Sequence, residues 1–170
     1  MCQPNLKYWL TLLLLAPPAT LGLPDDKQKP IELEANRAQY NQNTGVSIYE
    51  GSVIVTQGSI RLTADTMTMR TQESAIQTVE AVGNPATFRY KPAVDKEEIH
   101  GVGQRVNYDA ATGLIVVTEK ARFTQGQDVF TGERVEYDIN TDVVKAGGNA
   151  GSRVKFIIQP KSSSIAPKKK

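Results

Sequence analysis

The chain has one histidine, His100, and it stands next to the acidic pair Glu97-Glu98. A histidine beside carboxylates can act as a general acid or base. A serine nucleophile would have to complete such a site, but the sequence contains no Gly-x-Ser-x-Gly elbow. The run Asp95-Lys96-Glu97-Glu98 is instead typical of a solvated connection. We therefore expect His100 to have no catalytic role.

Two carboxylates, Asp65 and Glu133, are the next candidates, because paired carboxylates can hydrolyse glycosides. The same separation relates many other residue pairs of this chain, so we favour a structural role in turns or beside arginines. One histidine without cysteine partners cannot complete a zinc site, and no metal is expected. Gly101-Val102-Gly103 lacks the third glycine and the helix of a dinucleotide-binding fingerprint. With no phosphate-binding loop either, we expect no cofactor, no catalytic residues and a binding protein rather than an enzyme.

Residues 1–22 have the pattern of a secretory signal peptide. Lys7 precedes the apolar run at residues 9–16, and Pro17-Pro18 leads into small residues that end at Gly22. The run is shorter than the roughly 20 residues of a transmembrane helix. We expect cleavage near Gly22 and export, with an uncleaved anchor as the alternative. Cys2, the only cysteine, would leave with the signal peptide, so the mature chain would have no disulfide.

Charge is nearly balanced, with 20 lysines and arginines against 18 aspartates and glutamates. The positive excess lies in the tail at residues 161–170, which ends in Lys168-Lys169-Lys170. This tail has the composition of a disordered segment, with contact to an anionic surface as the alternative. No basic stretch carries interleaved aromatic residues, so no nucleic acid is expected as a partner. Between signal and tail, we expect a short extension at residues 23–29 and one domain at residues 30–160.

Apolar and polar residues alternate in short runs throughout the predicted domain. Examples are Ile31-x-Leu33-x-Ala35, Ile60-x-Leu62-x-Ala64 and Val154-x-Phe156-x-Ile158. This period of two predicts half-buried β-strands. Turn formers such as Asn43-Thr44-Gly45 and Ala111-Thr112-Gly113 separate the runs. The runs predict an all-β domain of about 14 to 16 strands.

Residues 33–70 repeat without a gap at residues 101–138, and eight of the 38 aligned pairs are identical. A weaker third copy, Arg134-x-x-Tyr137-x-x-x-Thr141, follows Arg105 by 29 residues. Two explanations stay open: a finer repeat of about 29 residues, or two hairpins inside the larger repeat. The repeat indicates stacked β units that bury one continuous interior. The identical pairs are Arg37/Arg105, Tyr40/Tyr108, Thr44-Gly45/Thr112-Gly113, Thr56-Gln57-Gly58/Thr124-Gln125-Gly126 and Thr63/Thr131.

The inward positions of the predicted strands are mostly aliphatic, because the domain has few aromatic residues. An aliphatic interior suits acyl chains better than flat aromatic or sugar ligands. The alternative, which patterning alone favours, is that these residues simply pack against each other.

Several phrases of the domain resemble the OstA-like family of periplasmic lipopolysaccharide-export proteins, and the resemblance covers roughly Lys29 to Pro160. The most distinctive is the phrase Gly-x-Val-x-Val-x-Gln-Gly. The matching phrases are Pro30-Ile31-Glu32-Leu33-Glu34-Ala35-Asn36, the run from Tyr49 to Asp65, Gly83-Asn84-Pro85-Ala86-Thr87-Phe88, and Gly101-x-Gly103 before Val106-Asn107-Tyr108.

The resemblance implies an incompletely closed, twisted antiparallel β-jellyroll of about 16 strands, folded like a V. Its apolar groove would hold the acyl chains of lipid A, the membrane anchor of lipopolysaccharide. It also implies head-to-tail self-association between the inner-membrane partner LptC and the N-terminal domain of the outer-membrane partner LptD. Such a stack would form a bridge across the periplasm.

Family lipid contacts fall on Ile31, Phe88 and Tyr108, whereas Ala110 stands where the family often has a larger residue. Together with predicted inward positions they give the candidate lipid-binding residues Ile31, Leu33, Ile48, Val55, Leu62, Met67, Phe88, Tyr108, Val116, Phe123 and Val135. The first and last strands would supply the edges for assembly, with candidate residues Ile31, Leu33, Ala35, Val154, Phe156 and Ile158. Unpaired backbone groups on such edges can be extended by another chain.

Two other functions stay open from the sequence. An LptC-like docking subunit of the same machine would keep its N-terminal segment as a membrane anchor. A solenoid enzyme acting on polysaccharide would need Asp65 or Glu133 in its groove.

Overall fold

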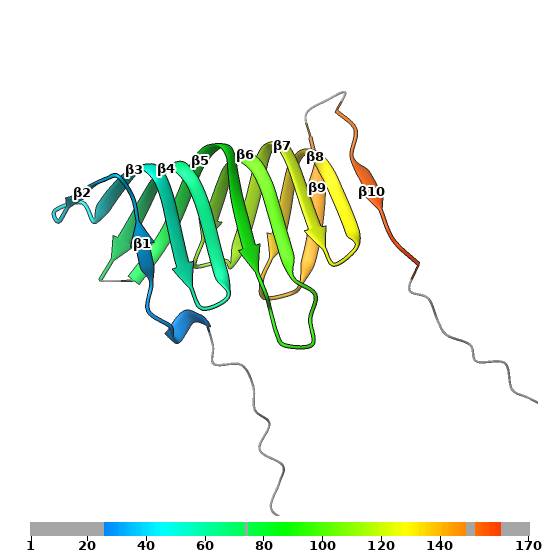
Figure 1. Ribbon diagram of the computed structural model, residues 1–170, viewed down its shortest axis with the longest axis horizontal. Helices are drawn as coiled ribbons and strands as arrows, with labels where there is room; N and C mark the ends of the chain where they lie inside the picture. Colours follow the sequence, from blue (N-terminus) through cyan, green and yellow to red (C-terminus); the bar gives the residue numbers. More distant parts are fainter. Residues whose placement is uncertain (1–25, 74, 149–151, 161–170) are drawn as a thin grey trace, which may run out of the picture.

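The computed structural model describes residues 26–73, 75–148 and 152–160, which form one antiparallel β-sheet after a short 3-10 helix at Asp26–Gln28 (Figure 1). The predicted signal peptide and basic tail lie outside the described residues. The strands are β1 (Glu32–Glu34), β2 (Arg37–Asn41), β3 (Val46–Gln57), β4 (Ile60–Gln72), β5 (Ala75–Tyr90), β6 (Ile99–Asp109), β7 (Leu114–Gln125), β8 (Asp128–Asp138), β9 (Val143–Gly147) and β10 (Lys155–Ile157).

The sheet is a meander whose strands pair with their neighbours in the sequence from β3 through β8. At one edge, β1 and β2 pair with the two ends of β3. At the other, β10 and β9 pair with the two ends of β8. Within the described residues these two edges do not pair with each other, so the sheet remains open.

Each long strand bends near its middle. The register shifts between Glu50 and Val53 where β3 pairs with β4, and every later pair through β7–β8 has a shift at the same level. Such bulges bend a strand and increase its twist. The sheet consequently folds over into two facing layers, joined along the upper side in Figure 1. The first layer carries β1 and β10, and the second carries β2 and β9.

This bend reconciles the strand count with the sequence. The ten described strands become sixteen segments when each of the six long strands is divided at its bend. The prediction of an all-β, incompletely closed and twisted antiparallel jellyroll of about 16 strands is therefore confirmed.

The internal repeat places the bends. Gly51 and Ser52 in β3 have positive φ angles of 80° and 50°. The residues 68 positions later, Glu119 and Lys120 in β7, have φ angles of 62° and 64°. Left-handed backbone is costly for residues other than glycine, so its occurrence at equivalent positions marks a required bend. The larger repeat of the sequence is thus a repeat of bent strands.

Asp65 lies at the same level and has the structural role that the sequence favoured. Its Oδ2 accepts a hydrogen bond from the backbone N–H of Asn84 at 3.0 Å, across the bend of β5. A carboxylate that holds a backbone amide in this way supports the local turn of the chain.

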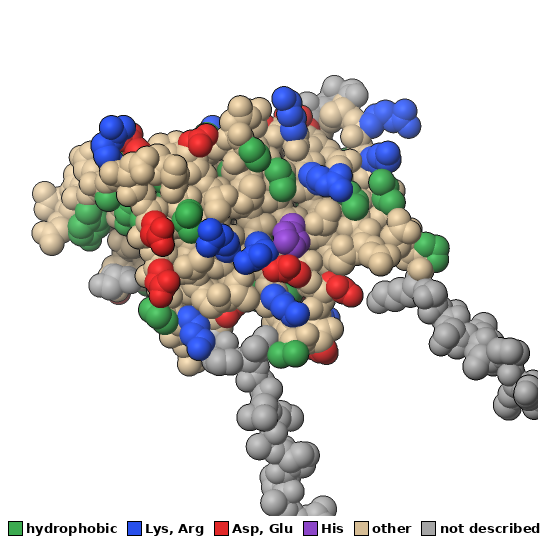
Figure 2. Space-filling model, in the orientation of Figure 1, with side chains coloured by type: hydrophobic (Ala, Val, Ile, Leu, Met, Phe, Trp, Pro, Cys, Tyr) green, Lys and Arg blue, Asp and Glu red, His purple; other side chains and the backbone are tan. Residues whose placement is uncertain are grey.

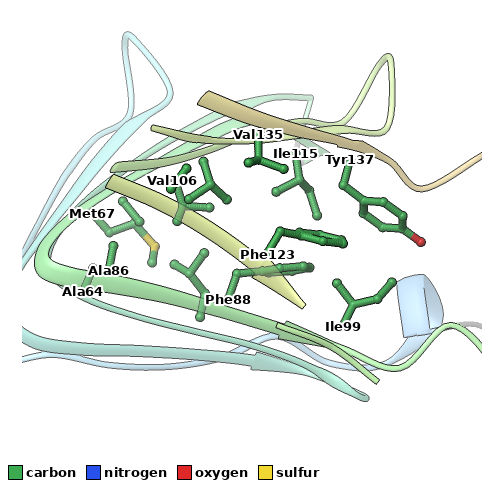
Figure 3. Packing of buried hydrophobic residues seen from close by; sticks show 14 of the residues in the cluster. Ala64, Met67, Ala86, Phe88, Ile99, Val106, Ile115, Phe123, Val135 and Tyr137 are labelled. Carbon is green, nitrogen blue, oxygen red and sulfur yellow. The ribbon is translucent and has the colours of Figure 1, made fainter. Parts of the chain in front are cut away.

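Between the layers, the inward residues form one apolar core. In Figure 3 the side chains of the two layers point toward one another, with Ala64, Met67 and Ala86 close to the bend. The two alanines are small enough to let the layers converge there, while Met67 and the larger residues farther away fill the space between the layers. The most buried members are Val53, Met67, Ala81, Ala86, Ile99, Val106, Val117, Phe123, Val135 and Tyr137.

The outer face carries the charges, mixed in sign (Figure 2). Arg105 is paired with Glu80 and lies 3.6 Å from Glu119, and Arg134 lies 2.8 Å from Glu136. These cross-strand and same-strand pairs are solvent-exposed, so each stabilises the fold only modestly.

Three turns share one capping arrangement. The side-chain oxygens of Asn41, Asp109 and Asp138 each accept a hydrogen bond from the backbone N–H group three residues later. They are the residues that follow Tyr40, Tyr108 and Tyr137, so the third copy seen in the sequence is a repeat of this turn. Hydrogen bonds from Thr112, mainly from its backbone N–H and then from its hydroxyl, lower the pKa of Asp109. Hydrogen bonds from Thr141, mainly from its side chain, lower the pKa of Asp138.

These turns predict a specific loss of stability in acid. Because the folded pKa of Asp109 lies below its ordinary value of 3.8, its contribution is complete above that value and is lost as pH falls through the folded pKa. Asp109→Asn keeps the capping oxygen, as Asn41 does, but cannot titrate. We expect its melting temperature to match the wild type at pH 7 and to fall less between about pH 5 and pH 2.

Thermal melts across pH measure this difference. Asp109→Ala is the control, because it loses the cap itself and should melt lower at every pH. Parallel curves for the wild type and Asp109→Asn would show that this carboxylate contributes nothing to acid sensitivity.

Candidate functional site

An apolar cavity of about 190 Å³ lies between the two layers. It is placed toward the β1 edge, because the aromatic residues Phe123 and Tyr137 fill the interior farther along. Its lining residues are Asp26, Ile31, Val55, Gln57, Ile60, Leu62, Met67, Met69, Ile76, Val79, Phe88, Tyr90, Lys91, Pro92, Val106, Tyr108, Ile115 and Ile139. Apolar side chains dominate this set, so the cavity can hold hydrocarbon.

The few polar groups of the cavity belong to its rim. Asp26 is held by Ser59, whose backbone N–H and hydroxyl donate to the two carboxylate oxygens at 3.1 and 2.5 Å. The Ser59 hydroxyl lies within hydrogen-bonding distance of both the carbonyl and the N–H of Lys91. This cluster ties the 3-10 helix to the turn after β3 and to the end of β5. It therefore holds the N-terminal segment, including Ile31, across one side of the cavity.

The cavity opens onto an apolar row that crosses the whole first layer. Directly paired residues follow one another on successive strands from β1 to β10, so their side chains share the inward face. Phe123 and Phe130 are 6.0 Å apart between ring centroids, and Phe130 and Phe156 are 5.1 Å apart. The row is Leu33, Val55, Leu62, Phe88, Gly101, Phe123, Phe130 and Phe156.

Six of the eleven candidate lipid-binding residues line the cavity. They are Ile31, Val55, Leu62, Met67, Phe88 and Tyr108. Three others, Leu33, Phe123 and Val135, lie on the same inward face but pack in the core. The structure thus brings nine of the candidates to the interior, which is the geometry that lipid contact requires.

Ile48 and Val116 are the exceptions, and their predicted position needs correction. Ile48 pairs with Thr68 on the outer face, and Val116 pairs there with Asn107 and Glu136. Their neighbours point inward instead, including Ser47 and Tyr49 in β3 and Ile115 and Val117 in β7. Neither residue lines the cavity: Ile48 is 38% exposed, and Val116, although only 7% exposed, is not part of the core cluster.

The cavity also contains residues that the candidate set missed. Ile76, Val79, Tyr90 and Ile139 line it, and two of them follow the period-two signal. Val79 continues to Ala81, and Phe88 continues to Tyr90, so alternation could have found both. Ile139 comes after the last residue of β8, where the strand pattern gives no signal.

Two tyrosines near the interior are neutral at physiological pH. Burial, with the nearby carboxylate of Asp109, raises the pKa of Tyr108. Burial raises the pKa of Tyr137 further, and its hydroxyl donates a hydrogen bond to Asp142 at 3.1 Å. Neither ring therefore brings charge to the apolar space.

The described surface offers no constellation for catalysis around His100. Its Nε2 lies 3.0 Å from Glu98, which also lies 3.2 Å from Arg89, and all three side chains are substantially exposed (Figure 2). In the described ranges, no group of three or more histidine, cysteine, aspartate or glutamate side chains could hold a metal ion. The same ranges contain no helix of the length and apolarity needed to span a membrane.

The fold and the cavity together define a class of protein, an open two-layered β-sheet with an apolar interior that suits a lipidic ligand. Comparisons with known proteins identify the family within that class. Residues 32–143 match the family described as LptA/(LptD N-terminal domain) LPS transport protein. The chain belongs to this family.

Relatives cover nearly its full length. The lipopolysaccharide export system protein LptH of Pseudomonas aeruginosa is 35% identical over 152 residues, 85% of this chain and 87% of that protein. LptA of Haemophilus influenzae is 28% identical over 92% of each chain. LptA of Escherichia coli K12 is 27% identical over 92% of this chain and 84% of its own.

A solved structure supports the same assignment. The crystal structure of LptH is described as the LptA-homologous periplasmic component of the lipopolysaccharide transport device of P. aeruginosa. It superposes with a TM-score of 0.75 at 34% identity, covering 81% of this chain and all of the other.

The cavity predicts where apolar ligands bind. Val79→Trp would fill the space with an indole ring, so we expect binding of the uncharged fluorophore N-phenylnaphthylamine to weaken by roughly tenfold, ~1.4 kcal/mol. Fluorescence titration measures the affinity. Val82→Trp is the matched control, because Val82 is on the same strand but pairs with Thr66 and Arg105 on the outer face. Equal affinity in both variants would place the binding site elsewhere.

Proposed function

We propose that this chain is a lipopolysaccharide-binding transport protein of the periplasm. It holds lipid A acyl chains between its two layers and stacks head to tail with further copies. The observation that carries the proposal is the apolar cavity inside an open sheet, in a chain whose relatives are lipopolysaccharide export proteins.

The hydrophobic effect gives the reason for such a protein. Burial of one methylene is worth about 0.8 kcal/mol, so exposing an acyl chain of a dozen carbons to water costs on the order of 10 kcal/mol. Lipid A carries several such chains. A carrier must therefore cover hydrocarbon continuously, and the row from Leu33 to Phe156 gives the first layer an inward apolar surface from edge to edge.

The size of the cavity limits how the lipid is held. An engineered apolar cavity of about 150 Å³ accommodates benzene, so about 190 Å³ holds a short segment of one acyl chain. Several complete chains need more space. Separation of the two layers supplies it, because within the described residues the chain passes between the layers only along the bends. On the opposite side separate turns meet, and Asp142 would have to release Lys96 and Gln125, which it contacts at 3.5 and 3.4 Å.

The two open edges account for assembly. At one end Ile31 is 42% exposed and at the other Phe156 is 48% exposed, although both are large apolar residues. The two edges differ, so a contact between them is heterologous and propagates into a stack. In this proposal LptC covers the stack at the inner membrane, and the N-terminal domain of LptD covers it at the outer membrane.

Export completes the proposal. The signal-like residues 1–22 direct the chain to the periplasm and are removed, which separates this protein from a membrane-anchored docking subunit. N-terminal sequencing of the protein from cells distinguishes the two. The chain has no recognisable nucleotide-binding motif, so the energy for directional transport comes from its partners.

The lipid site predicts a pattern of crosslinks. A photoreactive amino acid at Phe88 or Ile31, both at the cavity, should capture lipopolysaccharide in cells, detected as a shifted band with antibody to the sugar. The same probe at Ile48, on the outer face and 38% exposed, should capture at least about fivefold less. Crosslinking that is equally strong from Ile48 would contradict the proposed site.

The two edges predict the effect of placing a charge in the contact between stacked copies. Phe156→Asp introduces a carboxylate beside Phe130 at the β10 edge, and Ile31→Asp does so at the other end. We expect both to weaken self-association in sedimentation experiments, and Ile31→Asp to reduce lipid crosslinking as well. Val94→Asp, in the loop between β5 and β6 and 67% exposed, is the control. Unchanged assembly and crosslinking in both edge variants would defeat the proposal.

A further inference from the structure

We propose that the stack has one register, in which β10 of one copy pairs antiparallel with β1 of the next and Lys155 lies opposite Glu34. The inference rests on the head-to-tail stacking of the proposed function and specifies the surface that performs it. A second copy of this chain is the occupant of each edge.

The direction of pairing follows from the number of strands. Eight strands lie on the path from β1 to β10, and each is antiparallel to the next. Because the number is even, β1 and β10 run in opposite directions. A copy added in the same orientation therefore meets β1 with an antiparallel β10, and the alternation of hydrogen-bonded and non-hydrogen-bonded pairs continues across the joint.

Side-chain chemistry selects the register along that edge. Placing Phe156 beside Leu33 of the next copy continues the apolar row of the first layer without interruption. The same antiparallel register places Val154 opposite Ala35 and Ile158 opposite Ile31. All three pairs are apolar and face inward. Exposed fractions of 40% for Val154 and 70% for Ile158 show how much of this surface the single copy leaves uncovered.

The outward side chains of these edges have opposite charges. Lys155 stands at the end of the outward row that begins with Glu34, and the register places the two opposite each other. Within the described residues, no ion pair within 4.0 Å involves either side chain, and both are exposed. The next outward pair joins Ile157 to Glu32. Only one of the two glutamates therefore faces a lysine, which makes the register measurable.

Neighbouring registers are poorer. A slip of two residues in one direction keeps the faces and places Lys155 opposite Glu32. It also sets Ile158 opposite Lys29 in place of Ile31 and moves Phe156 out of line with Leu33. A slip in the other direction places Lys155 opposite Asn36 and Phe156 opposite Ala35, which removes the ion pair and leaves the phenyl ring against a methyl group. A slip of one residue turns the apolar side chains to the outside.

The second layer is consistent with this joint. β9 and β2 are likewise antiparallel, and their inward residues continue the rows of that layer. Val144 pairs inward with Tyr137 at one edge, and Tyr40 pairs inward with Ser47 at the other. Tyr40 is 58% exposed, so a neighbour that brings Val144 beside it would cover a ring now open to water.

A charge-exchange experiment tests the register. Glu34→Lys places like charges at each joint, so we expect the dissociation constant of self-association to rise roughly three- to thirtyfold in sedimentation equilibrium at low salt. Lys155→Glu alone should weaken association similarly. The double variant restores an opposite pair and should return to within about threefold of the wild type. High salt should shrink these differences.

Glu32→Lys is the matched control, because Glu32 is also exposed on the same strand but faces Ile157 in this register. Lys155→Glu should not rescue it. All these side chains are exposed, so circular dichroism and thermal melts should show the wild-type fold.

The outcomes separate the two proposals. A monomeric wild type would overturn head-to-tail stacking and the register with it. A wild type that stacks, with no rescue of Glu34→Lys, would overturn the register alone. Rescue of Glu32→Lys in place of Glu34→Lys would also overturn it, because that result indicates the slipped register.

Discussion

The register shifts of the long strands are the constraint on which the rest of the structure depends. A flat meander of these lengths would expose one complete apolar face to water. The shifts occur at one level in every pair from β3–β4 to β7–β8, so the face folds onto itself and becomes an interior. Left-handed residues at Gly51 and Ser52, and again at Glu119 and Lys120, fix the bend locally. Because the fold line crosses the strands and runs along the direction of strand pairing, the interior forms while both edges stay free.

The interior and the edges are therefore two results of one geometry. A barrel of the same strands would bury its apolar face by pairing its first strand with its last. Here the two layers bury that face against each other, and the apolar row of the first layer continues from the β1 edge to the β10 edge. The cavity lies toward the β1 edge, whereas the aromatic side chains Phe123, Phe130 and Tyr137 gather toward the β10 edge.

Much of this fold could be predicted from the sequence, because alternation and turn residues are local signals. In the 68-residue repeat, β7 is the copy of β3, and the single strand β6 is the copy of β1 and β2 together. Alternation failed where its phase was ambiguous. Leu114-Ile115-Val116-Val117 is apolar at every position, and in Val46-Ser47-Ile48-Tyr49 the inward pair includes a buried serine. The repeat then carried the same error from Ile48 to Val116. The hydrogen bonds from Ser59 to Asp26 and from Lys91 to Ser59 join segments that are distant in the sequence, so no local pattern predicts them.

The meander has a consequence for how the molecule folds. From β3 to β8 each strand pairs with the strand before it in the sequence, so folding can advance strand by strand. While the sheet grows, the last strand formed is an edge strand with unpaired backbone groups and one exposed apolar face. This edge is of the same kind as the one that the folded protein keeps at β10. Two incompletely folded chains could pair wrongly through such edges. Growing chains would therefore depend on rapid completion of their own sheets, or on holdase chaperones, to avoid aggregation.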